Sequence, residues 1–231
     1  MDLGILCAGG ATTTIYPSSS AEESRYIIND SGTVVIFVED KGQCDKVLSV
    51  REELPNLKKV VVMDKGAQSC NTEDGFVINI NDLVALGTQW NADNQTGFQE
   101  RVDNQKPTDL ATLIYTSGTT GTPKGVELTH DCWNFEAEAV DKYGLIKAKD
   151  VHYLWLPLSH SFGKVLEAAC IRMGTPTAVD GRVERLVENL AVIKPTFLAA
   201  VPRVFEKVYN KVIAGAKDGP AWKYTLFKRA L

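Results

Sequence analysis

The feature that most restricts the fold is an alternation of short apolar runs with helical patterns near the start of the chain. Residues 33–38 form a nearly continuous run of β-branched and aromatic side chains, which is typical of a strand buried on both faces. Residues 43–53 follow a helical pattern that stops before Pro55, and residues 59–63 form a second apolar run. Strand, helix and strand at this spacing predict βαβ units, and therefore an α/β fold with a parallel-rich sheet flanked by helices.

The same alternation continues through the rest of the chain, apart from one polar stretch. Residues 64–109 are rich in Asn, Asp, Gln, Gly and Thr, which predicts a long surface connection with one helical island at 82–90. Ser20 and Glu23 have the spacing of a capping box, so a helix is expected to follow Ser20. Further strands are predicted at 11–16, 110–115, 151–156, 175–179 and 196–201. Further helices are predicted at 130–143, 161–173, 183–194 and from Pro202 onward.

Composition excludes several classes of protein. The 231 residues are 44% hydrophobic and 23% charged, close to the average of soluble globular domains and unlike a wholly disordered chain, collagen or a coiled coil. The formal net charge of −4 comes with no clustered basic face, so a nucleic-acid partner is not expected. Five scattered cysteines contain no Cys-x-x-Cys pair, which argues against a metal site and favours reduced thiols in the cytosol.

Targeting and membrane segments are not expected either. The N-terminal sequence has no basic region, and its apolar run is too short for a signal peptide. No stretch approaches the roughly 20 apolar residues of a membrane helix. These features predict a cytoplasmic protein without a transmembrane segment, and they leave open a peripheral contact with a membrane.

Residues 116–125 carry the clearest chemical pattern. Glycines let the backbone turn several N–H groups toward one point, where they form an anion-binding nest, and hydroxyl side chains and Lys124 add donors and a positive charge. The pattern is not a Walker A motif, because Pro123 precedes the lysine and Gly125 follows it. On composition alone, an ordinary mobile loop remains an alternative. The candidate phosphate-binding residues are Thr116, Ser117, Gly118, Thr119, Thr120, Gly121, Thr122, Pro123, Lys124 and Gly125.

The string from Tyr115 to His130 resembles the signature of the acyl-adenylate-forming synthetases, also called AMP-binding enzymes. All ten positions 116–125 agree with the phosphate loop of that family. Residues 9–23, 156–163 and 195–209 are similar to segments of its long-chain fatty acyl-CoA synthetase branch. The resemblance covers nearly the whole chain in the order of the family.

This resemblance implies a two-step reaction. A fatty acid carboxylate attacks the α-phosphorus of ATP to give acyl-AMP and pyrophosphate, and the thiol of coenzyme A then displaces AMP. Mg²⁺ normally accompanies the ATP. Residues 116–125 would hold the β- and γ-phosphates, with Lys124 as a catalytic residue.

The resemblance also places His160 in a segment that borders the acyl and pantetheine pocket. A role for His160 as a second catalytic residue is expected, with capping of the following helix as the alternative. His130 is expected to be structural, and His152 receives no role. Three aromatic residues are expected in the core rather than lining a pocket: Trp133, Trp155 and Phe162.

Residues 1–231 are predicted to form an incomplete AMP-binding N-terminal domain, with the mobile C-terminal domain absent. The adenine, ribose and Mg²⁺ ligands of the family would then lie outside the chain, and the chain alone would have little activity. Two alternatives to a long-chain fatty acid–CoA ligase stay open: a ligase for another carboxylic acid or a carrier protein, and a non-catalytic remnant. Acyl chain length and oligomeric state are not predicted.

Overall fold

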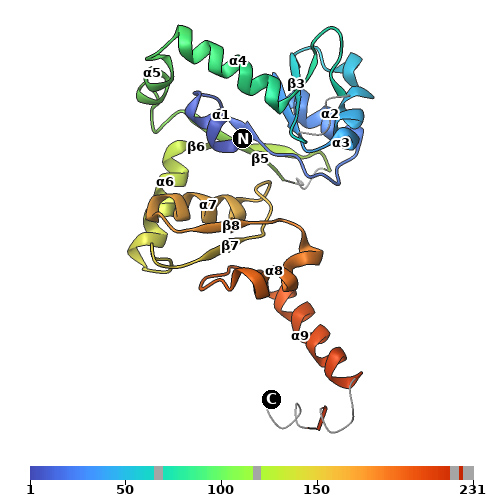
Figure 1. Cartoon of the computed structure of the whole chain (residues 1–231), viewed down its shortest axis with the longest axis vertical. Coiled ribbons are helices and arrows are strands. Elements are labelled where there is room, and N and C mark those ends of the chain that lie inside the picture. Colours follow the sequence, from blue (N-terminus) through green and yellow to red (C-terminus); the bar gives the residue numbers. More distant parts are fainter. Residues whose placement is uncertain (65–69, 117–120, 219–223, 226–231) are drawn as a thin grey trace. The chain divides into compact units, whose positions relative to one another are not determined.

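The structure of the chain is a computed structural model, shown in Figure 1. It describes residues 1–64, 70–116, 121–218 and 224–225, except for the side chains at 207, 208, 211 and 212. The chain divides into two compact units. Unit 1 comprises Met1–Phe135 with Leu158–Ser161, and unit 2 comprises Glu136–Pro157 with Phe162–Leu231. Within the described residues, no helix combines the length and the hydropathy that crossing a membrane requires.

Unit 1 contains a three-stranded parallel sheet in the order β2-β3-β4. Val35 pairs with Lys59, and Val60 pairs with Val77, in parallel register. This sheet confirms the parallel pairing predicted from the alternating pattern. Its strands and associated helices are β2 (Val35–Val38), α3 (Lys41–Leu48), the 3-10 helix η1 (Arg51–Glu53), β3 (Lys59–Val62), β4 (Val77–Asn79) and α4 (Ile80–Asp93).

The helix α2 (Ala21–Asp30) and α3 pack against this sheet around an aliphatic cluster. The predicted capping box starts α2: the backbone N–H of Glu23 donates to Ser20 Oγ at 3.1 Å, and the N–H of Ser20 donates to Glu23 Oε2 at 2.9 Å. Two donors that the helix itself cannot satisfy are thereby paired. Buried members of the cluster are Ile28, Val38, Cys44, Val47, Val60, Val62 and Val77.

A second sheet of unit 1 has the order β1-β5-β6, with β5 in the centre. β5 is parallel to β1 and antiparallel to β6. Trp133 is buried beside this sheet, and its Nε1 donates to Thr112 Oγ1 at 3.2 Å. The strands and neighbouring helices are α1 (Asp2–Cys7), β1 (Thr12–Thr13), α5 (Gly97–Asp103), β5 (Leu110–Thr116), β6 (Lys124–Thr129) and α6 (His130–Lys142).

Unit 2 contains two parallel strands joined by a helix, and Tyr153, Trp155 and Leu186 form its buried centre. Trp155 Nε1 donates to the carbonyl of Ala199 at 2.9 Å. The connecting helix has the predicted bounds of 161–173. The elements are β7 (His152–Leu154), α7 (Ser161–Met173), β8 (Thr177–Val179), the 3-10 helix η3 (Val183–Arg185), α8 (Leu186–Ile193) and α9 (Pro202–Lys217).

Several predictions for secondary structure are wrong or incomplete. The strand predicted at 11–16 is reduced to β1 at Thr12–Thr13, and the helix α5 in the polar stretch was not predicted. The polar stretch 64–109 contains β4, whose Val77 is fully buried because it pairs with β3. Residues 196–201 form only a bridge from Phe197 to His152, and not a strand. Residues 33–38 are not buried on both faces, since β2 lies at the edge of its sheet and leaves Val35 40% exposed.

Candidate functional site

The segment that resembles a phosphate loop joins β5 to β6 at the tip of an antiparallel hairpin. Thr116 pairs with Lys124, and Tyr115 pairs with Gly125, so the two ends of the loop lie side by side. Gly121 has a φ of 86°, a conformation that glycine adopts without strain. Four of the predicted loop residues lie outside the described part of the chain: Ser117, Gly118, Thr119 and Thr120.

The described loop residues present donors to solvent. Lys124 is exposed at the first position of β6, and Thr116 and Thr122 are also exposed. An ammonium group and hydroxyl groups on neighbouring residues are donors that phosphate oxygens accept, and charge-assisted bonds of this kind are the strong ones. The pairing of β5 with β6 places Thr116 directly opposite Lys124. Binding of phosphate by these residues stays a prediction, and so does their part in catalysis.

Two tyrosines contact the chain on either side of this loop, and sequence analysis assigned no role to either. Tyr26 Oη on α2 donates to the carbonyl of Pro123 at 2.9 Å, and Tyr115 Oη on β5 donates to Asp30 Oδ2 at 2.7 Å. The two rings meet edge to face with centroids 6.4 Å apart. Burial, together with the Asp30 carboxylate, raises the pKa of Tyr115 well above its usual value, so its hydroxyl stays a donor.

His160, the second predicted catalytic residue, is exposed and directly precedes α7. It belongs to the short stretch Leu158–Ser161, which is part of unit 1. Thr14 Oγ1, one residue beyond β1, donates to the carbonyl of Leu158 at 3.1 Å and connects this stretch to the body of the unit. This position suits either of the two roles considered for His160, which remains a candidate.

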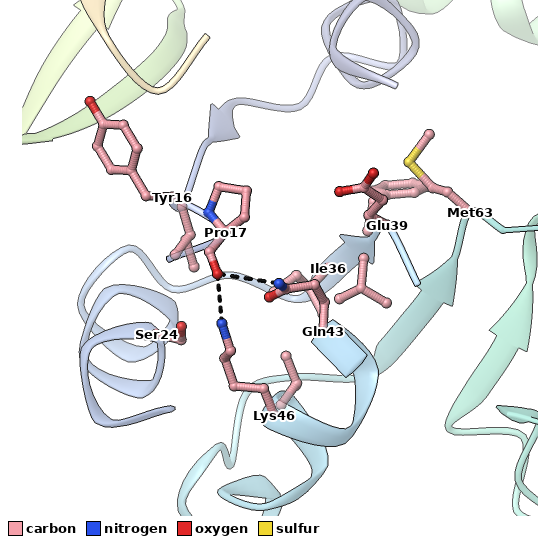
Figure 2. Close-up of a pocket in the computed structure, with 12 residues that line it drawn as sticks. Tyr16, Pro17, Ser24, Ile36, Glu39, Gln43, Lys46 and Met63 are labelled. Atoms are coloured by element: carbon pink, nitrogen blue, oxygen red, sulfur yellow. Dashed lines mark hydrogen bonds between the residues drawn. The ribbon is translucent and has the colours of Figure 1, made fainter. Parts of the chain in front are cut away.

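A cavity of about 470 Å³ lies in unit 1, where β2 and β3 end at their carboxyl sides. This edge is where ligands bind in open α/β sheets, and the volume suits a small molecule. Figure 2 shows Lys46 and Gln43 reaching the carbonyl of Pro17, at 2.8 and 3.2 Å. Glu39 and Met63, which directly follow the two strands, also line the cavity. Sequence analysis missed this site because its walls come from segments far apart in the chain.

In unit 2, His152 is completely buried on β7, although it received no role from the sequence. Its Nδ1 lies 3.1 Å from Cys170 Sγ on α7. Its Nε2 has no hydrogen-bond partner among the described residues. Burial lowers the pKa of His152 and raises that of the Cys170 thiol, so both groups are kept neutral. A neutral buried thiol is a poor nucleophile, and the pair is a packing feature.

Two of the three aromatic residues expected in the core are there. Trp133 and Trp155 are 9% and 5% exposed, whereas Phe162 is 37% exposed. Within the described ranges, no group of three or more His, Cys, Asp or Glu side chains is arranged to hold a metal ion.

Comparison with known proteins decides the family. A family model described as AMP-binding enzyme matches residues 1–228. The chain belongs to the AMP-binding enzyme family. Among curated relatives, the chain is 34% identical to a long-chain-fatty-acid–CoA ligase of Mycobacterium bovis over 215 residues, which cover 91% of the chain. It is 32% identical to a long-chain-fatty-acid–CoA ligase of Rattus norvegicus over 221 residues, also 91% of the chain. The chain spans 33% and 29% of the lengths of these two relatives.

Solved structures agree on the fold. The adenylation domain of a carboxylate reductase from Mycobacterium chelonae matches the chain with a TM-score of 0.68 at 18% identity, covering 96% of this chain and 36% of the other. The A domain of a carboxylic acid reductase from Segniliparus rugosus, solved with AMP, matches with a TM-score of 0.68 at 15% identity, covering 98% and 39%. At these identities the likeness shows the adenylate-forming fold alone.

Proposed function

We propose that this chain supplies the phosphate loop of a ligase that activates a long-chain fatty acid with ATP and transfers the acyl group to coenzyme A. The observation that carries the proposal is the complete ten-residue string 116–125 in the sequence. Lys124 is exposed at the first position of β6, where it pairs with Thr116. The substrate class is supported by relatives in which the same 91% of the chain aligns with long-chain-fatty-acid–CoA ligases.

In this proposal, the chemistry divides between the substrates and the loop. The carboxylate oxygen forms a bond to the α-phosphorus of ATP, and the bond from that phosphorus to its bridging oxygen breaks, releasing pyrophosphate. Lys124 and the hydroxyls of Thr116 and Thr122 hold the β- and γ-phosphates. They neutralise the charge that grows on the leaving group, which is where electrostatic stabilisation lowers the barrier. The thiol of coenzyme A then attacks the acyl carbon and AMP leaves.

Mg²⁺ is the ion expected to travel with ATP. Such an ion is usually held by substrate phosphates with one or two carboxylates. None of the described residues is assigned to the ion. The loop residues act on the phosphate oxygens directly.

We also propose that the reaction takes place in the cytoplasm. All five cysteines are free thiols: Cys7, Cys44, Cys70, Cys132 and Cys170. Disulfides are rare in reducing compartments, so free thiols suit a cytosolic protein.

The direct test is fatty-acid-dependent ATP–pyrophosphate exchange in the full-length protein, meaning the longest reading frame that contains these residues. Lys124→Ala is expected to lower exchange roughly tenfold to hundredfold, because it removes a charged hydrogen bond to the phosphates. Lys142→Ala is the matched control, since Lys142 is exposed on α6 and paired with Glu138. Unchanged exchange in the Lys124 variant would contradict the loop assignment.

The same assay with a panel of acids tests the substrate class. Activity with long-chain fatty acids and poor activity with short, aromatic or carrier-linked acids is the expected result. The reverse preference would support the related ligase that acts on another acid. The absence of exchange with every acid would support a non-catalytic protein.

A further inference from the structure

The base of the loop is held from outside the hairpin by two residues of α2. Tyr26 and Asp30 are four positions apart on α2, and such residues share one face of a helix. Tyr26 binds the carbonyl of Pro123 on the outgoing limb at 2.9 Å, and Asp30 binds the hydroxyl of Tyr115 on the incoming strand at 2.7 Å. One helical face therefore contacts both limbs of the hairpin.

The ring of Tyr115 packs closely against the backbone of β6. Tyr115 faces Gly125 across the hairpin. A Cβ at position 125 would lie 3.0 Å from the Cζ and 3.1 Å from the Oη of Tyr115. The tyrosine ring thus rests on the backbone next to Lys124, and only glycine allows this approach without a shift of the ring.

The contact of Tyr26 with Pro123 supplies a hydrogen bond at a position where the backbone of the hairpin has no donor. Proline has no N–H group, so the chain at position 123 can be fixed by hydrogen bonds only through its carbonyl. That carbonyl is the acceptor for Tyr26, directly before Lys124. The Tyr26 ring also packs edge-on against Tyr115, so the two contacts support each other.

We propose that Tyr26, Asp30 and Tyr115 form a positioning clamp that fixes both limbs of the hairpin and so presents Lys124 to the phosphates of ATP. These are positioning residues, because they act through Lys124 and do not touch the nucleotide. The clamp rests on the proposed function for its ligand, but its contacts lie entirely within unit 1. Its effect is on phosphate binding and not on the fatty acid.

The experiment compares four variants of the full-length protein. Tyr26→Phe removes only the hydroxyl that binds Pro123. Asp30→Ala removes the acceptor for Tyr115, whereas Asp30→Asn keeps a carbonyl acceptor in the same place. Tyr143→Phe is the matched control, because Tyr143 is 82% exposed in unit 2. Three quantities are measured: affinity for inorganic pyrophosphate, the KM values for ATP and for fatty acid, and hydrogen–deuterium exchange of the backbone amides at 124–126.

The clamp predicts a selective loss. Tyr26→Phe and Asp30→Ala should weaken pyrophosphate binding and raise the KM for ATP roughly threefold to tenfold, the size of one lost hydrogen bond. They should also speed amide exchange at 124–126 and leave the KM for fatty acid unchanged. Asp30→Asn should recover most of the wild-type values.

Other outcomes overturn the clamp. Wild-type pyrophosphate affinity in Tyr26→Phe would do so, and so would equal losses in Asp30→Asn and Asp30→Ala. Wild-type protein without any affinity for pyrophosphate would also overturn it. If wild-type protein binds pyrophosphate but activates no carboxylic acid, the proposed function fails, and the comparison of pyrophosphate affinities still decides the clamp.

Discussion

The imidazole of His152 is a titratable group buried in unit 2. It is fully buried, its Nδ1 contacts Cys170 Sγ, and its ring lies 5.5 Å from that of Phe197, centroid to centroid. The titratable side chain that contacts His152 is the Cys170 thiol. Burial keeps this thiol neutral. A positive charge at this position would have no compensating partner among the described residues, so protonation must oppose folding.

This burial predicts acid-induced destabilisation. An unfolded histidine titrates near 6.5, and burial lowers the pKa of His152 in the folded chain. Below about pH 6.5 the unfolded state therefore binds more protons than the folded state. The free energy of unfolding then decreases as the pH is lowered, until the pH passes the pKa of His152 in the folded chain. Denaturant unfolding followed by tryptophan fluorescence between pH 7.5 and 5 should show this slope. His152→Gln should flatten it, and Cys170→Ala should keep it.

Asp180, an acidic residue of unit 2, does not titrate in that pH window. Hydrogen bonds from Arg182 hold the pKa of Asp180 well below its usual range, so its contribution is present above about pH 4 and is lost only below that. A slope between pH 6.5 and 5 that persists in His152→Gln would contradict the assignment to His152.

At the scale of elements, local pattern predicted some pieces correctly and missed others that depend on distant partners. The bounds of α7 and the capping box of α2 were predictable, because side-chain spacing within one segment determines them. β4 was not, since its three residues form a strand only through pairing with β3. The candidate site divides in the same way: the 116–125 string is local, whereas the Tyr26–Pro123 contact joins residues 97 positions apart.

Two helical glycines give a matched prediction at this scale. A Cβ at Gly163 in α7 would lie 2.5 Å from the carbonyl oxygen of Pro157, so Gly163→Ala should destabilise unit 2 by about 1–3 kcal/mol through the required backbone shift. At Gly87 in α4, no atom lies within 4 Å of an added Cβ. Gly87→Ala should therefore stabilise the folded chain by roughly 0.5–1 kcal/mol, because alanine has the higher helix propensity. Urea unfolding measures both, and equal effects would contradict the role given to Pro157.

Across the described chain as a whole, many large apolar side chains remain exposed. In the helix predicted at 183–194, Leu186 is buried, but Val183 and Val187 are 52% and 46% exposed. Val192 on α8 and Phe205 on α9 are 77% and 58% exposed. A chain with this many exposed large apolar side chains is prone to aggregation.

The 231-residue chain should therefore self-associate. Light scattering after size exclusion is expected to show oligomers, and a dye that binds apolar surface should fluoresce before thermal unfolding. Val192→Glu combined with Phe205→Lys should reduce both signals, while Lys41→Glu, a charge change at an exposed position on α3, should not. A monodisperse monomer with a sharp transition at high temperature would contradict this expectation.

The position of β1 beside β5 also has a consequence for synthesis on the ribosome. Thr12 pairs with Thr112, so the first strand meets its partner only after about 100 further residues have been made. At bacterial or eukaryotic rates of about 5–20 residues per second, this delay is roughly 5–20 s. The β2-β3-β4 sheet can form during that interval, before β5 and then β6 of the loop-bearing sheet are made. The β1 segment thus stays unpaired, available to a chaperone, until β5 emerges.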